Sequence, residues 1–184
     1  ITACGLGWDI TDFGSGSFES RGLVLFTLRN GRPGGAVKPY AEKIMVVNEN
    51  QETPLHFHFD KQEDIINRGG GVLLFELFNS TASEELADTP VEVKVDAITR
   101  TLKAGETLAL QPGESLTLPP GLYHRFYAAE GSGRVLTGEV SAVNDDHSDN
   151  RFHETLGRFP EIIEDEEPYR LLVSDYDTFL GVRP

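Results

Sequence analysis

The chain contains 184 residues, a length that suits one domain with a sizeable hydrophobic core. Its 30 acidic and 16 basic side chains give a formal net charge of −14, and its pI is about 4.7. Such a surface repels phosphate groups. This argues against nucleic acid and anionic membrane surfaces as partners and is compatible with a neutral sugar.

Targeting signals are weak in this sequence. No apolar run approaches the length of about 18 residues that a membrane-spanning helix needs. Cys4 is the single cysteine, so an intrachain disulfide is excluded and a reducing compartment, the cytoplasm, is expected. Residues 1–5 lack the basic region and apolar block of a signal peptide, and the lack of an initiator Met suggests further residues upstream.

Residues 1–22 are expected to form an irregular arm, because residues 8–20 are rich in Gly, Ser, Asp and aromatic side chains. β-rich runs then follow, separated by turn signals such as Asn30-Gly31. The glycines at positions 69–71 predict a turn rather than a phosphate-binding loop, because no helix pattern follows them. The predicted strands are residues 23–28, 43–47, the stretch around His56 and His58, and residues 72–78, 91–95, 98–102, 107–110, 115–118, 122–128 and 134–141.

The remaining segments are predicted to be mostly loop. Residues 80–89 are polar, and a C-terminal extension over residues 142–184 begins as polar, acidic loop. Within it, residues 161–167 form an acidic run that indicates a solvated surface, and residues 171–173 predict a last short strand. Many short strands with Gly/Pro turns and almost no helical periodicity indicate an all-β, closed or double-sheet barrel. Since no linker or repeat interrupts it, a single domain spanning residues 1–184 is expected, with its barrel core over about residues 23–141.

A candidate metal site stands out in the stretch that begins at Pro54. On a strand, side chains alternate between faces, so His56 and His58 point the same way. Glu63 follows five residues after His58, which lets the chain bend and return a carboxylate to the same centre. A fourth ligand is predicted from His124, which opens a strand after a Pro-Gly turn. First-row divalent metals accept this mixture of nitrogen and oxygen ligands.

These two stretches fit the paired motifs of the cupin superfamily. The first, H-x-H-x4-E-x6-G, is matched by His56, His58, Glu63 and Gly70. The second, G-x5-P-x-G-x2-H, is matched by Gly113, Pro119, Gly121 and His124. The second motif normally closes with Asn four residues after the His, where this chain has Ala128, a departure that touches no predicted ligand. The resemblance implies a cupin fold, a double-stranded β-helix or jelly-roll barrel.

Within the cupins, the chain resembles the D-lyxose isomerases, from about Gly7 to about Tyr176. The resemblance implies a metal-dependent aldose–ketose isomerase that interconverts D-lyxose and D-xylulose, with D-mannose and D-fructose as a related pair. It also implies one divalent metal per chain, with Mn as the activating ion, although the ligand types allow Zn, Co, Ni or Fe. The runs that carry this resemblance are residues 25–31, 40–45, 63–71, 118–124, 138–141 and 143–146.

Catalysis of an aldose–ketose exchange requires a group that moves a proton between adjacent carbons. Glu139 is a candidate because it shares a polar strand face with Thr137 and Ser141. Its strand is expected to pair with the His124 strand, so this polar face would line the cavity. Lys61 lies between the histidine pair and Glu63, and Lys43 points either to the barrel rim or inward. These three residues are predicted to be catalytic.

Several further expectations complete the prediction. Asp145 and Arg158 are predicted to bind substrate, whereas His147 and His153 are not expected to be ligands. Phe57 and Phe59 face away from the histidine pair and are expected to pack in the core. A homodimer formed through an edge sheet is expected, which would hide an exposed strand edge.

Three functions remain compatible with a cupin metal site, because such sites share geometry across chemistries. The first is the isomerase, acting by proton transfer through an enediol-like intermediate, with a hydride shift as the alternative route. The second is an iron-dependent oxygenase. The third is a non-catalytic metal- or sugar-binding cupin, in which the metal would be structural.

Overall fold

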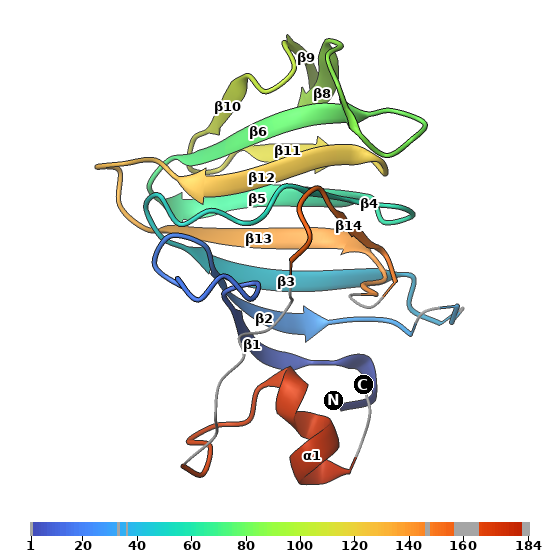
Figure 1. Cartoon of the computed structure of the whole chain (residues 1–184), viewed down its shortest axis with the longest axis vertical. Helices are drawn as coiled ribbons and strands as arrows, with labels where there is room; N and C mark the ends of the chain where they lie inside the picture. Colours follow the sequence, from blue (N-terminus) through green and yellow to red (C-terminus); the bar gives the residue numbers. More distant parts are fainter. Residues whose placement is uncertain (1, 33, 36, 146–147, 157–165, 182–184) are drawn as a thin grey trace.

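The computed structural model of the chain describes residues 2–32, 34–35, 37–145, 148–156 and 166–181 (Figure 1). Almost all of its regular structure is antiparallel strand, arranged in two curled sheets, and this confirms the all-β cupin prediction. The larger sheet has eight strands, in the order β1 (Gly7–Thr11), β2 (Leu23–Arg29), β3 (Tyr40–Val47), β13 (Val135–Ala142), β5 (Glu63–Gly70), β11 (Ser115–Leu118), β8 (Val91–Val95) and β9 (Ile98–Leu102).

The smaller sheet has six strands and lies in front of the larger one in Figure 1. Its order is β10 (Thr107–Leu110), β6 (Leu73–Ser80), β12 (Leu122–Ala128), β4 (His56–His58) and β14 (Asn150–Phe152), with β7 (Leu86–Ala87) paired to β6.

Alternation of side chains along the strands places one face of each sheet in the core. In β3, for example, Ala41, Lys43, Met45 and Val47 are buried while the residues between them are partly exposed. The apolar cluster between the sheets includes Phe75, which is fully buried. Each such side chain contributes roughly 1.5–3 kcal/mol when fully buried. This packing holds the inward-facing polar residues in fixed positions.

The N-terminal region contains a strand where an irregular arm was expected. Trp8 and Ile10 alternate with the buried Asp9 and Thr11 along β1, which pairs with β2. Trp8 lies opposite Phe26, and their rings make an edge-to-face contact at 4.8 Å. Cross-strand pairing therefore overrides the turn-rich composition of the neighbouring residues.

The predicted strand over residues 171–173 is wrong. Val173–Asp175 form a 3-10 turn, η2, and the short helix α1 (Tyr176–Leu180) follows. The turn forms because the Asp175 carboxylate accepts a hydrogen bond from the Leu172 amide at 2.7 Å. Tyr176 is buried and its hydroxyl donates to the Leu6 carbonyl, which anchors α1 beside β1.

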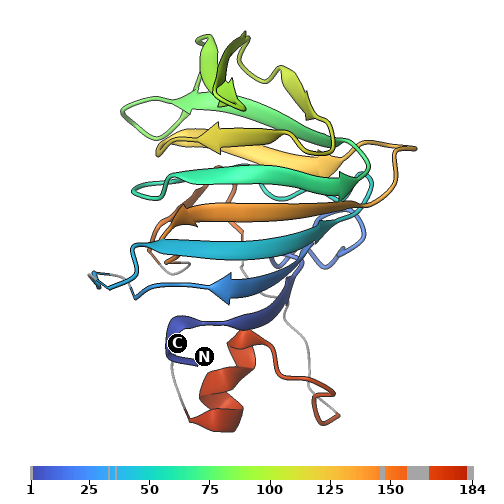
Figure 2. The ribbon, with the colours of Figure 1, turned by 180° about the vertical axis from the view of Figure 1, so that it is seen from behind.

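The two opposite views in Figures 1 and 2 show β1 and α1 at one end of the molecule and the β8–β9 hairpin at the other. Two smaller differences from the expected loops are β7, within residues 80–89, and β14, within the extension after Ala142. Most of the acidic run over residues 161–167 lies outside the described residues. Within the described part of the chain, no helix has the length and apolar character needed to cross a membrane.

The predicted glycine turn is present where β5 passes into β6. Comparing Gly70 in this turn with Gly113 separates the cost of backbone strain from the cost of a steric clash. Gly70 has φ of +97°, and a Cβ there would lie 2.1 Å from the Arg134 carbonyl oxygen. Gly113 has φ of +98°, but a Cβ there would meet nothing within 4 Å. We expect Gly113→Ala to cost about 1–3 kcal/mol through backbone strain alone. Gly70→Ala should lower the free energy of unfolding by more, because the backbone must also shift to admit the Cβ. Equal losses of unfolding free energy for the two variants, measured by urea denaturation, would contradict this interpretation.

Candidate active site

Three imidazole rings converge on one point in the core. His56 and His58 lie on the same face of β4, and His124 lies on β12 directly opposite His56. One ring nitrogen of each residue lies within 4.8 Å of the corresponding nitrogen of the other two. His58 and His124 are buried, so two neighbouring strands of the six-stranded sheet bring all three rings together in the interior.

Backbone carbonyls fix the tautomer of each ring. His56 Nδ1 contacts the Pro54 carbonyl at 2.8 Å, His58 Nδ1 contacts that of Asp149 at 3.2 Å, and His124 Nδ1 contacts that of Leu122 at 3.0 Å. A carbonyl can only accept, so each Nδ1 carries the proton and each Nε2 presents a lone pair to the centre. Burial, helped by the neighbouring His124 and His58 rings, holds the pKa of His56 well below its usual value.

Glu63 enters the same centre from β5 of the opposite sheet. Its Oε1 lies 3.1 Å from His124 Nε2 and 3.4 Å from His58 Nε2, and its Oε2 lies 2.7 Å from Lys61 Nζ. Burial acts to raise the pKa of Glu63, but the Lys61 ammonium and the contacting His58 and His124 rings together outweigh it, so the net pKa lies well below the ordinary value. The residue is therefore an ionised carboxylate.

This donor set fits a divalent first-row metal. Ligands bound at about 2.1 Å and at right angles to one another lie about 3.0 Å apart, close to the spacing of the Glu63 oxygen from the two imidazole nitrogens. His124 Nε2 is buried and makes no hydrogen bond with any described residue. Lone pairs that face one another in a buried site favour a cation, so the three histidines could hold one, with Glu63 close to two of them.

A second charged cluster adjoins the first. Glu139 Oε1 lies 3.2 Å from Lys61 Nζ and 3.4 Å from Lys43 Nζ, and it accepts a hydrogen bond from the Ser141 hydroxyl at 2.9 Å. Burial acts to raise the pKa of Glu139, as does Glu63, but Lys43 and then Lys61 lower it further, so its pKa falls below normal. The three predicted catalytic residues thus lie together beside the histidine cluster.

The expected partner of the Glu139 strand is wrong. β13 pairs with β3 and β5 in the eight-stranded sheet, whereas the His124 strand, β12, pairs with β4 and β6. Glu139 lies opposite Lys43 in the β3 register, which explains their ion pair. β13 turns its polar face towards the interior of the barrel. Glu139 therefore approaches the histidines from the opposite sheet.

A pocket opens onto both clusters. Its polar lining contains the three histidines, the two glutamates and the two lysines described above. Its apolar lining includes Phe13 and Phe152, whose ring centroids lie 6.2 Å apart, together with Leu23, Leu25 and Met45. A small molecule that carries both hydroxyl groups and carbon-bound hydrogens suits such a site.

Of the two predicted substrate-binding residues, the structure describes only Asp145. Asp145 does not line the pocket, and its carboxylate accepts hydrogen bonds from the Ser148 amide and hydroxyl. Arg158 and His147 lie outside the described residues. His153 is exposed, as the non-ligand prediction expects.

The two phenylalanines beside the histidine pair differ from each other. Phe57 is buried against Tyr123, as expected, but Phe59 is 44% exposed, so the core prediction for Phe59 is wrong. The chain has already left the sheet at that position, because β4 ends at His58.

Several residues that shape the site were not predicted to belong to it. Asn144 accepts a hydrogen bond from Lys43 Nζ at 2.6 Å and pairs reciprocally with Asn30. Asp149 and Asn150 lie at the start of β14, next to β4. All of them approach the site through contacts between distant segments, which no local spacing pattern reveals.

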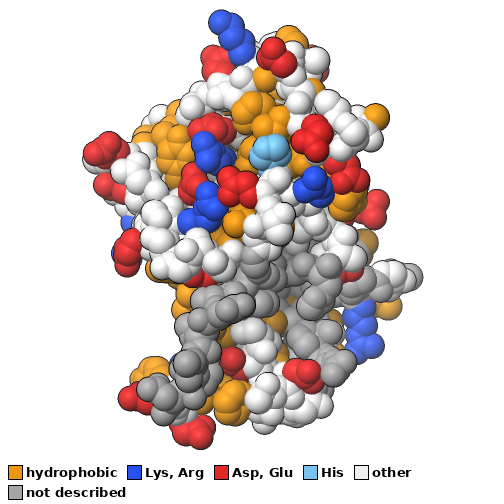
Figure 3. Space-filling view, viewed as in Figure 1, with side chains coloured by type: hydrophobic (Ala, Val, Ile, Leu, Met, Phe, Trp, Pro, Cys, Tyr) orange, Lys and Arg blue, Asp and Glu red, His pale blue; other side chains and the backbone are white. Residues whose placement is uncertain are grey.

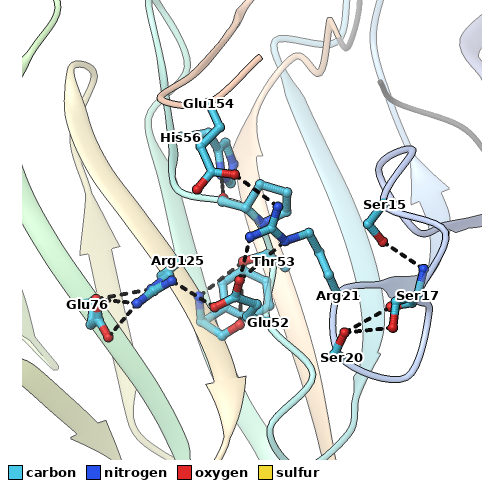
Figure 4. A network of polar contacts seen from close by, with 12 residues as sticks. Ser15, Ser17, Ser20, Arg21, Glu52, Thr53, His56, Glu76, Arg125 and Glu154 are labelled. Atoms are coloured by element: carbon cyan, nitrogen blue, oxygen red, sulfur yellow. Dashed lines mark hydrogen bonds and ion pairs between the residues drawn. The ribbon is translucent and has the colours of Figure 1, made fainter. Parts of the chain in front are cut away.

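An ion-pair network lies on the face of the six-stranded sheet opposite the pocket, beside the segments that carry His56 and His124 (Figure 4). Glu52 accepts from Arg21 at 2.8 Å and from Arg125 at 2.7 Å, and so ties the N-terminal region to β12. In spatial order, the network contains Glu154, Arg21, Glu52, Arg125 and Glu76. Figure 3 shows acidic and basic side chains interleaved across the middle of this face. Linked pairs of this kind stabilise more than isolated surface pairs do.

The comparison with known proteins identifies the family. Residues 1–176 match the family model described as D-lyxose isomerase. The chain belongs to the D-lyxose isomerase family. A D-lyxose/D-mannose isomerase of Serratia proteamaculans is 54% identical over 178 residues, which cover 96% of this chain and 78% of that protein. One of Escherichia coli O157:H7 is 53% identical over 176 residues, covering 95% and 78%. The chain is thus a sugar isomerase, as the sequence predicted.

Solved structures support the same fold. The L-ribose isomerase of Cellulomonas parahominis with L-ribose superposes with a TM-score of 0.58 at 15% identity, covering 82% of this chain and 84% of that one. The enzyme of Acinetobacter sp. DL28 in complex with L-ribose gives 0.57 at 16% identity, covering 79% and 80%. At these identities the likeness establishes the fold alone.

Proposed function

We propose that the protein is a metal-dependent isomerase that interconverts D-lyxose and D-xylulose, and also D-mannose and D-fructose. The observation that carries this proposal is the buried Lys43–Glu139–Lys61 cluster in contact with the Glu63 and histidine donor set. The names of the two relatives, both D-lyxose/D-mannose isomerases, support the choice of sugars.

His56, His58, Glu63 and His124 would hold the metal, with Mn as the activating ion and Zn, Co, Ni or Fe able to bind the same donors. When bound, a divalent ion supplies Lewis-acid polarisation of a carbonyl oxygen, which acidifies the neighbouring C–H bond. The backbone carbonyls that hold each Nδ1 proton keep the three rings oriented for this task.

Glu139 is the proposed base that moves the proton between C1 and C2 through an enediol-like intermediate. Its depressed pKa keeps it ionised, and the Ser141 hydroxyl fixes the carboxylate that Lys43 and Lys61 flank. The two ammonium groups would stabilise negative charge that develops on the substrate oxygens. The substrate-binding roles of Asp145 and Arg158 stay predictions.

The alternatives receive less support. An iron-dependent oxygenase could use the same donor set, and a non-catalytic cupin could keep a structural metal. Neither requires a buried glutamate between two buried lysines at the pocket wall, an arrangement that is costly unless it is used. Membership of a sugar isomerase family also favours isomerisation.

Ketose formation from a panel of aldoses tests the proposed function. Protein treated with a chelator should lose activity towards D-lyxose and D-mannose, and Mn²⁺ should restore it, because the metal supplies the carbonyl polarisation. His124→Ala should abolish the recovery by removing one donor. Full activity in the chelated protein, or oxygen consumption with iron in place of ketose formation, would contradict the proposal.

Replacing Glu139 tests the proton-transfer route. Glu139→Gln should lower kcat by roughly 10²–10⁴-fold, the contribution of a positioned general base, while the matched exposed variant Glu92→Gln should match the unmodified chain. In deuterated water, the unmodified enzyme should place solvent deuterium in the ketose. A product without solvent label under slow turnover would favour a hydride shift instead.

We also propose a homodimer, formed through the outer face of the eight-stranded sheet and not through a strand edge as the sequence analysis expected, in the region that Figure 2 turns towards the viewer. Ile10, Val24, Val46 and Leu136 are direct neighbours across four strands and form an unbroken apolar row. Ile10 is 42% exposed and Leu136 is 44% exposed. A contiguous exposed apolar surface of this kind is typical of an interface, and a second copy presents the same surface.

Charged substitutions on this face test the dimer. The variant with Leu136→Lys and Val140→Lys should elute near the 20.3 kDa mass of one chain, whereas the unmodified chain should elute near twice that mass. Ile98→Lys, on the exposed β9 strand at the far end of the sheet, is the control and should remain dimeric. A monomeric unmodified chain would exclude the dimer.

A further inference from the structure

Asp149 stands out among the buried polar residues that the proposed chemistry does not use. It is 8% exposed and immediately precedes β14, in the C-terminal extension outside the expected barrel core. Its carboxylate accepts hydrogen bonds from two successive backbone amides, Asp60 at 2.7 Å and Lys61 at 3.1 Å. One carboxylate therefore accepts hydrogen bonds from two successive amides of the turn that follows β4.

The backbone carbonyl of Asp149 serves the same turn. It accepts from His58 Nδ1 at 3.2 Å and lies 3.4 Å from the Phe59 amide nitrogen, with which it also hydrogen-bonds. Pairing of Asn150 with His58 extends this contact into the β14–β4 ladder. The two oxygens of the carboxylate and the carbonyl oxygen thus fix four consecutive residues, 58–61.

This turn determines where the Lys61 ammonium lies. Lys61 Nζ must reach Glu63 Oε2 at 2.7 Å and Glu139 Oε1 at 3.2 Å at once, and these two carboxylates come from different strands. A long side chain satisfies both only if its own backbone is fixed. The amide of Lys61 is one of the two groups that Asp149 binds. The carboxylate therefore acts on the cluster through the Lys61 backbone.

We propose that Asp149 is a positioning residue of the isomerase site, whose carboxylate holds the 58–61 turn so that Lys61 bridges Glu63 and Glu139. The proposal rests on the proposed isomerase function. It assigns separate tasks to the two parts of the residue. The carboxylate positions Lys61, while the backbone carbonyl, which every substitution retains, orients His58.

A double-mutant cycle tests this assignment. Asp149→Asn should lower kcat by about 10–100-fold, the usual effect of a residue that supports an active-site ligand, with a smaller change in KM. Mn²⁺ affinity, measured calorimetrically on the metal-free protein, should change by less than about 3-fold, because the carbonyl remains. In a Lys61→Met background, Asp149→Asn should have little further effect on kcat. Equal losses in both backgrounds would mean a general structural role and would overturn the proposal.

Amide hydrogen exchange provides a readout that does not depend on activity. In Asp149→Asn the amides of Asp60 and Lys61 should exchange faster, while those of β12 should be unchanged. Asp96→Asn is the matched control, because Asp96 also caps a backbone amide, that of Ser115, on an exposed turn away from the pocket. Unchanged exchange at residues 60 and 61 would overturn the proposal even in an active enzyme. An unmodified chain without isomerase activity would instead show that the proposed function has failed.

Discussion

The arrangement of the site depends on a balance of buried charge. Lys43 and Lys61 are matched by Glu63 and Glu139, and all four are at least 95% buried. Removing such groups from water is expensive, and apolar residues of similar size would often give a more stable core. The cluster is therefore better explained by chemistry than by stability. Because the four charges cancel, a bound divalent ion would leave a positive centre, which favours a substrate that becomes negatively charged in the reaction.

The double-sheet fold is what brings these groups together. Imidazoles come from the six-stranded sheet, on β4 and β12, whereas Glu63, Glu139 and Lys43 come from the eight-stranded sheet. Lys61 lies on the turn between β4 and β5, and its ammonium contacts Glu63 and Glu139 of the eight-stranded sheet. The site thus forms only when the two sheets pack, and the apolar cluster around it determines the distances. Low polarity in this interior also strengthens each interaction within the site.

Local sequence patterns predicted the parts of the site that depend on spacing along the chain. The two cupin motifs identified the histidines and Glu63, and strand alternation pointed to Glu139 and Lys43. What failed was pairing between distant strands: β13 lies beside β3 and β5 and not beside β12. Asp149 was missed for the same reason, because it binds Lys61 across 88 residues of sequence. A single sequence indicates side-chain alternation and turns, but it does not indicate which distant segments contact one another.

The core strands and the segments near the two ends of the chain contribute different residues to the pocket. Strands β3, β5 and β13 supply Lys43, Glu63 and Glu139, whereas Phe13, before β2, and Phe152, at the end of β14, supply part of the apolar wall. Phe13 has φ of +56°, an unfavourable backbone conformation for this residue, and the Thr11 hydroxyl accepts a hydrogen bond from its amide at 2.9 Å. Strain at a pocket wall persists only where surrounding contacts enforce it. The terminal segments therefore help to shape the space that a substrate must fit, in addition to the support that Asp149 gives to the turn that carries Lys61.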